Sequence, residues 1–378
     1  MRENVLVVIT KGIPFESGGA AAIVRNLFVN VNNKSKVCLL GRKAEFLPSK
    51  NTLPYDCFEI PLSNQSHNIL IKIFLFLKSL LIGIEIIKQK KATNILGIYR
   101  DESSLVLSYL ISLFTKLPLS IYLTDLYAEC NPTFFRKFLQ KIIFAKAKNI
   151  FCLNEGMRQV YIDLYSIRTE LLPHTINDLN NCYKKKKQSL NTEFIIGYAG
   201  TIVPDRIDLL KELVEIIGKN INYKLRLFTP HDLKFLKKNN LYNDSVSNIY
   251  INNHDILISE LNKCDLLYLP LTFTNPKDSI YKLQLKSCLG TKSFDYLKSG
   301  SEILIHSPKE YLTYTFFEDN EIGFLLECGE KNALSNKLDC LYKEIKVSTF
   351  LSSDYSNILK IHKGEKVYND MIQTIFYE

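Results

Sequence analysis

The sequence predicts an α/β protein of two domains, each with a parallel sheet that helices cover on both faces. The chain has 378 residues, of which 46% are hydrophobic and 23% are charged, so it can bury large cores and is longer than one domain usually is. Apolar strands alternate with helices along the chain, which is typical of parallel sheets. A strand followed by a glycine loop and a helix also occurs twice, at 5–27 and at 194–208.

The composition limits the possible partners. A formal net charge of +9 and a pI near 8.9 favour nucleic acid, anionic lipid or phosphorylated small molecules, but the chain has no nucleic-acid recognition motif. Its nine cysteines occur without a Cys-x-x-Cys pair or zinc-ligand spacing, which is typical of reduced thiols in the cytoplasm. The first residues predict a strand rather than a signal peptide. We therefore expect a cytoplasmic protein that does not bind nucleic acid.

The first domain opens with an apolar strand, a glycine turn and a helix. Gly18 and Gly19 at the start of this helix let the backbone approach a ligand, although a tight turn without a ligand has the same residues. Neither a Gly-x-Gly-x-x-Gly pattern nor a P-loop is present. Further strands are predicted at 36–40, 94–98, 119–124 and 149–153.

A carboxylate follows one of these strands directly. Asp125 comes after the strand predicted at 119–124, and parallel sheets bind ligands at the carboxyl ends of their strands. Asp125 is therefore a candidate ligand-binding residue, and its alternative role is to cap the loop that follows.

Two helices of the first domain raise the question of membrane contact. The span 69–87 is strongly apolar, but Lys72, Lys78 and Glu85 interrupt it at about helical spacing, which predicts a polar stripe on a long soluble helix. The helix predicted at 134–148 mixes aromatic with basic residues. Such a helix fits an anionic membrane surface or a solvated basic face above its own sheet equally well.

A basic, polar segment at 183–189 marks a domain boundary. We predict a first domain at 1–182, a second at 192–355, and a C-terminal segment at 356–378 whose helix, at about 357–376, returns to the first domain.

The second domain contains a helix, a glycine and a strand between 290 and 305. Thr291 can cap the helix, apolar residues on its inner face pack inward, and Gly300 ends it in the left-handed conformation before a buried strand at 303–305. The helix N-terminus suits a phosphate and Asp295 suits a ribose diol. A surface helix with a solvated Asp is the alternative interpretation.

The segment 292–305 resembles the Lys-Leu-Phe-Glu-Tyr-Leu-Ala-Ala-Gly-Lys-Pro-Val-Ile stretch of GT-B glycosyltransferases of the GT4 type, also described as the glycosyltransferase family 1 type of C-terminal domain. Other segments resemble this family in the same order, and together they cover nearly the whole chain: 18–19, 125–127, 154–157, 172–176, 197–200, 258–270 and 321–334. The resemblance implies two Rossmann-like domains that face each other across a cleft, with a C-terminal helix that crosses back to the first domain.

The resemblance also implies roles for individual residues. Arg206 takes the place of the family's diphosphate-binding Lys, Lys292 supplies a second cation, and Asp125 lies beside the sugar. The implied catalytic residues are Asp125, Arg206 and Lys292. The implied donor-binding residues are Gly18, Gly19, Gly200, Thr201, Arg206, Lys292, Ser293 and Asp295.

At three positions the chain departs from the family. Thr201 stands where the family has an Arg, Ser287 stands where it has the first of two Glu, and His174 replaces a usual Asn.

The implied activity is that of a hexosyltransferase-like enzyme. It would transfer a sugar from a nucleotide-diphosphate donor to a glycan or lipid-linked acceptor, with retention, in surface polysaccharide or glycoconjugate synthesis. No metal and no cofactor is expected, because the chain lacks Asp-x-Asp, the usual metal and diphosphate motif of the other glycosyltransferase fold. The expected location is the cytoplasm, with peripheral contact to the anionic inner face of the cytoplasmic membrane.

Two alternatives remain open. A noncatalytic GT-B partner of a glycan-assembly complex would keep the fold without the chemistry. A sugar-nucleotide 2-epimerase would bind a similar donor, but it needs an acid/base carboxylate cluster that the sequence does not reveal.

Overall fold

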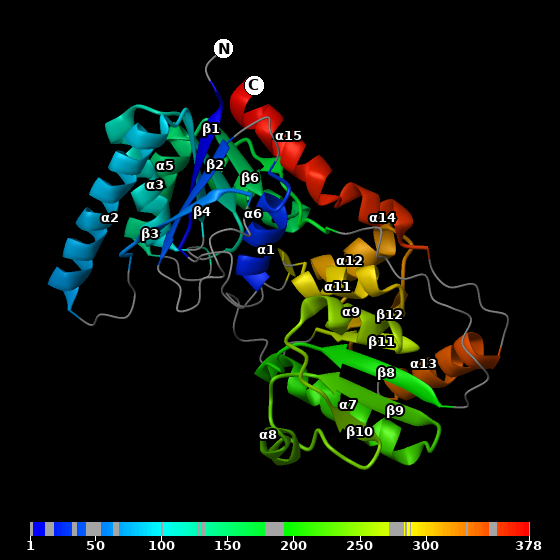
Figure 1. Cartoon of the computed structure of the whole chain (residues 1–378). Coiled ribbons are helices and arrows are strands. Elements are labelled where there is room, and N and C mark those ends of the chain that lie inside the picture. Colours follow the sequence, from blue (N-terminus) through cyan, green and yellow to red (C-terminus); the bar gives the residue numbers. More distant parts are fainter. Residues whose placement is uncertain are drawn as a thin grey trace. The chain divides into compact units, whose positions relative to one another are not determined.

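The computed structural model (Figure 1) describes residues 3–11, 19–31, 36–42, 54–62, 68–99, 101–126, 129, 133–177, 193–271, 283, 286–287, 289–329, 332–347 and 354–377. The chain divides into two compact units. Unit 1 comprises Met1–Asn177 and Ile361–Glu378, and unit 2 comprises Asp178–Lys360.

Unit 1 is built on a seven-stranded sheet in which all paired strands are parallel, in the order β3-β2-β1-β4-β5-β6-β7. The strands are β1 (Val5–Ile9), β2 (Lys36–Arg42), β3 (Asp56–Ile60), β4 (Asn94–Tyr99), β5 (Leu119–Leu123), β6 (Asn149–Cys152) and β7 (Glu170–Leu171). Their burial agrees with the long apolar runs from which strands were predicted, because a parallel sheet is covered on both faces. All four further strands predicted for this half are confirmed.

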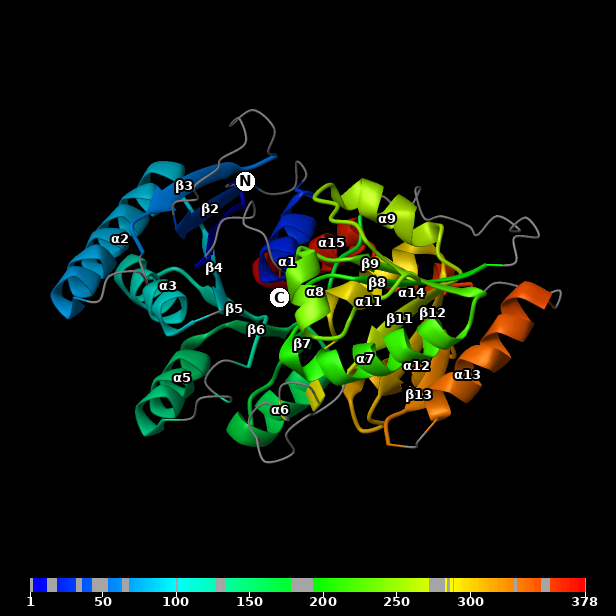
Figure 2. The same ribbon diagram turned by 90° about the horizontal axis from the view of Figure 1, so that it is seen from below.

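Helices cover both faces of this sheet (Figures 1 and 2). On one face α3 lies between α2 and α5 and packs against both of them. On the other face α1 and α15 pack together, with Phe28 and Tyr368 edge to face in a shared apolar core. The helices are α1 (Gly19–Phe28), α2 (Ile69–Lys90), α3 (Glu102–Thr115), α5 (Phe134–Lys146), α6 (Glu155–Tyr165) and α15 (Gly364–Tyr377).

The C-terminal segment returns to unit 1, but not as one helix. It contains α14 (Ser356–Ile361), of which only Ile361 belongs to unit 1, and α15, which lies in unit 1; His362 and Lys363 separate the two helices. Lys363 forms a parallel β-bridge with Ile176, so the Ile176 N–H donates to the His362 carbonyl at 2.8 Å and the Gly364 N–H to the Ile176 carbonyl at 3.0 Å. The prediction of a single helix at 357–376 is wrong, because the chain adopts extended pairing at this point.

Unit 2 contains a six-stranded parallel sheet in the order β10-β9-β8-β11-β12-β13. The strands are β8 (Phe194–Ala199), β9 (Tyr223–Phe228), β10 (Val246–Asn248), β11 (Leu266–Pro270), β12 (Glu302–Ser307) and β13 (Phe324–Glu327). The helices include α7 (Pro204–Lys219), α8 (Leu233–Lys238), α9 (His254–Asn262), α11 (Thr291–Ser299), α12 (Leu312–Asp319) and α13 (Ala333–Tyr342), which continues into a π-helix at Lys343–Val347. The predicted class of two α/β domains with parallel sheets is confirmed.

A buried ion pair connects the end of unit 2 to its sheet. Lys346, in the π-helix, lies 3.0 Å from Oδ1 of Asp265, which is fully buried. The other carboxylate oxygen of Asp265 accepts from the Ile195 N–H at 2.8 Å. A buried carboxylate is tolerated only when its oxygens are paired, and these contacts satisfy both of them.

Gly364 is required where α15 begins, because the backbone packs closely against asparagine side chains. Asn30 donates to Oδ1 of Asn177 at 2.9 Å, and Asn177 donates to the Asn26 carbonyl at 2.8 Å. A Cβ on Gly364 would lie 2.1 Å from Asn177 Oδ1 and 2.5 Å from Asn30 Nδ2. The asparagine contacts therefore leave no room for a side chain at this position.

We expect Gly364→Ala to lower the free energy of unfolding by about 1–3 kcal/mol, because the added methyl must displace these hydrogen-bonded groups. Urea unfolding measures the change. The control is Glu365→Ala, which removes only an exposed ion pair with Lys363 and should cost less than about 1 kcal/mol. Equal effects of the two variants would contradict this account.

Candidate functional site

The candidate site in unit 2 begins where β8 ends. Gly200 follows the strand with φ +104°, a conformation that favours glycine, and its N–H donates to the Phe228 carbonyl at 2.8 Å. A Cβ at this position would lie 2.3 Å from Cε of Lys292. Gly200 therefore provides both the turn and the space that the lysine side chain occupies.

Lys292, in the first turn of α11, extends its side chain over this loop. Its ammonium lies 3.2 Å from the Tyr198 hydroxyl, 3.4 Å from the Thr201 carbonyl oxygen and 4.8 Å from the centre of the Tyr198 ring. Thr201 is exposed and contributes its carbonyl group to this contact. Gly200, Thr201 and Lys292, three of the predicted donor-binding residues, are thus brought together.

A tyrosine of α11 fixes the helix on the sheet. The Ala199 N–H donates to the Tyr296 hydroxyl at 2.8 Å, and that hydroxyl donates to the Tyr268 carbonyl at 3.4 Å, so α11 is tied to both β8 and β11. Burial raises the pKa of Tyr296, while the positive charge of Arg206 acts in the opposite direction. Arg206 is half-buried in the first turn of α7, the helix that follows β8 in the chain.

Two helices begin at this edge of the sheet without a side-chain cap. The N-cap residues are Val203 for α7 and Gly290 for α11, and neither makes a side-chain hydrogen bond to its helix. The prediction that Thr291 caps α11 is wrong, because Thr291 is already the first helical residue. A Cβ on Gly290 would meet no atom of the described residues within 4 Å. Backbone N–H groups at such helix ends can bind an anion.

The remainder of the motif folds as predicted. Phe294 and Leu297 are buried, and Gly300 ends α11 in the left-handed conformation with φ +72°. The buried strand β12 follows.

Asp295 pairs with a histidine that sequence reasoning missed. His254 is the first residue of α9, and its Nε2 lies 2.9 Å from Oδ1 of Asp295. The hydrogen bond to Asp295 raises the pKa of His254 against the opposing effect of burial; the charge of Asp255 also raises it and that of Lys298 lowers it. No sequence pattern indicates the pair, because 41 residues separate its members.

Two serines of this region face inward. Ser293 is 1% exposed, and its hydroxyl has no hydrogen-bond partner in the described part of the chain. Its burial shields it from a ligand in this conformation, although it was a predicted donor-binding residue. Ser287, at the position where the family has a Glu, is buried and donates to the Leu283 carbonyl at 2.9 Å.

Unit 1 contains the remaining predicted residues. Gly18 lies outside the described residues, and Gly19 begins α1. Asp125 follows β5 as expected and is exposed. Its Oδ1 accepts from the Leu126 N–H at 2.9 Å and its carbonyl accepts from the Tyr161 hydroxyl at 3.3 Å, so the turn is held in place.

The buried carboxylate of Glu129, which the sequence analysis did not identify, supports the turn at Asp125 through Tyr161. Glu129 accepts hydrogen bonds from Tyr161 at 3.1 Å and from Tyr165 at 2.9 Å. Burial raises the pKa of Glu129, whereas these hydrogen bonds lower it.

His174, which departs from the family pattern, is buried in unit 1, and its carbonyl accepts a hydrogen bond from His362 at 2.7 Å. Its contact is structural.

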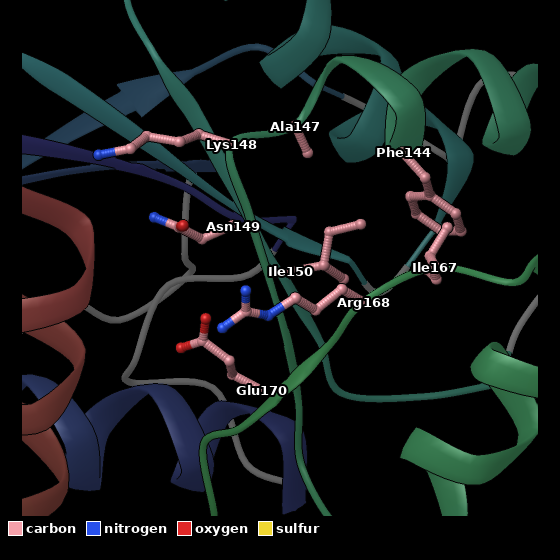
Figure 3. Close-up of a pocket in the computed structure, with 8 residues that line it drawn as sticks. All are labelled: Phe144, Ala147, Lys148, Asn149, Ile150, Ile167, Arg168 and Glu170. Carbon is pink, nitrogen blue, oxygen red and sulfur yellow. The ribbon is translucent and has the colours of Figure 1, made fainter. Parts of the chain in front are cut away.

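A cavity of ≈ 430 Å³ lies elsewhere in unit 1, where α5 leads into β6 (Figure 3). It contains none of the predicted site residues. Its lining consists of Phe144, Ala147, Lys148, Asn149, Ile150, Ile167, Arg168 and Glu170.

Among the described residues, no group of three or more His, Cys, Asp or Glu side chains could hold a metal ion. In the same part of the chain, no helix is both long and apolar enough to cross a membrane.

Comparison with known proteins identifies the fold. No family model matches the chain, and no curated protein matches it. Similar solved structures include a glycosyltransferase from Rickettsia africae (12% identity, 100% of both chains, TM-score 0.68) and Anabaena HepE in complex with UDP and glucose (14%, 99% of both chains, 0.67). A putative UDP-N-acetylglucosamine 2-epimerase from Listeria monocytogenes is also similar (12%, 99% of this chain and 96% of that chain, TM-score 0.55). At these identities the likeness shows the fold alone.

The chain therefore has the GT-B fold, with two parallel-sheet α/β units.

The His254–Asp295 pair predicts a pH dependence of stability. Because the folded pKa of His254 is raised above 6.5, its stabilisation is complete below that value and is lost as the pH rises through the folded pKa. Both side chains are partly exposed, so we expect only about 0.5 kcal/mol. His254→Gln should therefore lower the free energy of unfolding more at about pH 5.5 than at about pH 8.5. Urea unfolding at both pH values measures this, and an equal loss at both would contradict it.

Proposed function

We propose that this protein is a glycosyltransferase that moves a sugar from a nucleotide-diphosphate donor to an acceptor. The observation that carries the proposal is the position of Lys292 over Gly200 and Thr201, beside the uncapped start of α11. A cation, an open glycine backbone and a helix N-terminus without a side-chain cap form an arrangement suited to a diphosphate. HepE, which shares the fold, was solved with UDP and glucose, and this supports a nucleotide sugar as the donor.

The donor groups would be divided among the residues of unit 2. Lys292 and Arg206 bind the diphosphate and stabilise the negative charge that develops on it as the sugar leaves. Arg206 can form two parallel bonds to a phosphate, whereas Lys292 acts as a compact charge. Asp295 accepts from a ribose hydroxyl with one carboxylate oxygen while His254 holds the other.

The acceptor would be a glycan or lipid-linked sugar, bound by unit 1, in surface polysaccharide or glycoconjugate synthesis. Asp125 would lie beside the sugar, and its position after β5 supports this, because open α/β sheets bind ligands at the carboxyl ends of their strands. The family resemblance supports a GT4-like enzyme that retains the anomeric configuration, and a hexose as the transferred sugar.

The enzyme would act in the cytoplasm, in peripheral contact with the anionic inner face of the cytoplasmic membrane. Helix α5 supports this proposal. Its exposed Phe134, Phe135 and Phe138 alternate with basic residues, and cations near an anionic lipid surface add about 1 kcal/mol each.

An epimerase is the second candidate, because the Listeria protein shares the fold. A noncatalytic partner is the third, since Thr201 and Ser287 replace charged family residues. One assay distinguishes the three: incubation with UDP-N-acetylglucosamine and other nucleotide sugars, with and without acceptor. NMR of the products would show transfer to the acceptor, inversion at C2, or neither.

The donor site predicts the effect of three substitutions. Asp295→Ala, Arg206→Ala and Lys292→Ala should each weaken donor binding by roughly 1–3 kcal/mol and leave the fold intact, because each removes a hydrogen bond to a charged or hydroxyl group. Calorimetric titration with the nucleotide sugar that most raises thermal stability measures this. Asp208→Ala is the control, since Asp208 is exposed on α7 and forms an exposed ion pair with Lys211 of the same helix. Unchanged affinity in all three variants would remove these residues from the donor site.

Activity should survive chelation of divalent ions, because side-chain cations rather than a metal neutralise the diphosphate. The measurement is the transfer rate before and after EDTA, with Mg²⁺ or Mn²⁺ added back. A complete loss that either metal restores would show that the protein's cations are insufficient.

A further inference from the structure

The first half of α2 exposes large apolar side chains. Ile69, Leu70, Ile71, Ile73 and Phe74 are 65%, 71%, 47%, 50% and 64% exposed. Consecutive residues of a helix point in different directions, so this end of α2 is exposed almost all round. The predicted stripe of charged residues therefore does not describe it. The apolar side chains themselves face outward.

The second half of the same helix is packed normally. The buried residues of α2 are Ser79, Leu80, Gly83, Ile86 and Ile87, all in its second half, and α3 is a neighbour of α2. The exposed apolar residues are thus at the end of a helix that is firmly held at its other end. A cluster of this kind on a protein surface indicates an interaction site.

A second exposed apolar group lies at the same edge of unit 1. Phe134, Phe135 and Phe138 in α5 are 88%, 70% and 55% exposed. Both α2 and α5 begin after a strand, at the carboxyl edge of the parallel sheet, and α3 lies between them (Figures 1 and 2). The exposed ends of the two helices therefore belong to one helical layer and to one edge of it.

The charges around these side chains are positive. The charged residues of the exposed half of α2 are Lys72 and Lys78, and α5 contains no acidic residue. Helix α3, which lies between them, has an acidic residue in its first turn, Glu102, and this residue pairs with Arg136 of α5. An apolar surface bordered by cations matches the acyl chains and phosphates of an anionic lipid layer.

We propose that the first half of α2 inserts its apolar side chains into the interfacial region of an anionic bilayer, beside the phenylalanines of α5. Electrostatic attraction by lysines is screened by salt, whereas burial of apolar side chains is not. Membrane binding therefore has a salt-resistant part from α2 and a salt-sensitive part from the lysines of α5. This goes beyond the peripheral contact proposed for α5 alone.

The chain contains no tryptophan, so a single introduced one reports its own surroundings. Phe74→Trp should show a blue-shifted emission with vesicles of phosphatidylglycerol and phosphatidylcholine, and quenching by lipids with brominated acyl chains. The matched control is Phe114→Trp, in the last turn of α3 at the opposite edge of the sheet, where the phenylalanine is 62% exposed. This variant should show neither effect.

Three sets of substitutions separate the two parts of binding. Changing Leu70, Phe74 and Leu77 to Gln should reduce vesicle partitioning in high salt about tenfold or more, because three exposed apolar side chains are lost. The matched control changes Leu113 and Phe114 to Gln and should bind like wild type. Changing Lys137, Lys141 and Lys146 to Gln should reduce the salt-sensitive part and leave the salt-resistant part unchanged.

Several results would overturn the proposal. They are absence of vesicle binding by wild type, equal binding by wild type and the α2 variant, or a blue shift of Phe74→Trp that follows protein concentration without lipid. The last result, with a doubled mass in light scattering, would assign this surface to a second copy of the chain. Donor binding in unit 2 is measured separately by thermal stability, so a failure of membrane insertion would leave the transfer reaction standing.

Discussion

The candidate site depends on one buried hydroxyl, that of Tyr296. The N–H of Ala199, the last residue of β8, donates to the Tyr296 hydroxyl, and the same hydroxyl donates to the carbonyl of Tyr268 in the middle of β11. Because backbone groups buried without a partner are costly, this double contact fixes where α11 begins relative to the sheet. The position of Lys292 over Gly200, and of Asp295 beside His254, follows from it. A serine or phenylalanine at 296 could not make both bonds at that distance from the helix axis.

Local features of the sequence were sufficient for the elements of this site. The glycine that ends α11, the buried strand after it and the glycine after β8 each follow from the conformational preferences of single residues. The strands of unit 1 were equally clear, because buried parallel strands are continuous apolar runs. The break between α14 and α15 was not predictable in this way. Lys363 leaves the helical conformation because Ile176, far away in sequence, pairs with it.

The same limit applies to side chains in the site. His254 is the first residue of α9 and precedes the segment 258–270 that resembles the family, and its contact with Asp295 depends on how α9 packs against α11. Glu129 likewise acquires its role from two tyrosines of α6. Ser293 is the opposite case: its place in the motif suggested ligand contact, whereas its side chain is buried in this structure. Long-range packing decides which polar residues of a motif face a ligand.

The contacts of Lys292 bear on how the proposed donor site would be ordered before a donor binds. The ammonium is held by a neutral hydroxyl, a carbonyl oxygen and an aromatic ring, which together keep it near the start of α11. Hydrogen bonds to an ionised acceptor are about twice as strong as those to a neutral one. A diphosphate can therefore replace the Thr201 carbonyl as acceptor with a gain in free energy, and the side chain needs to move little. The contact with the Tyr198 ring leaves the N–H groups of the Lys292 ammonium available to a phosphate.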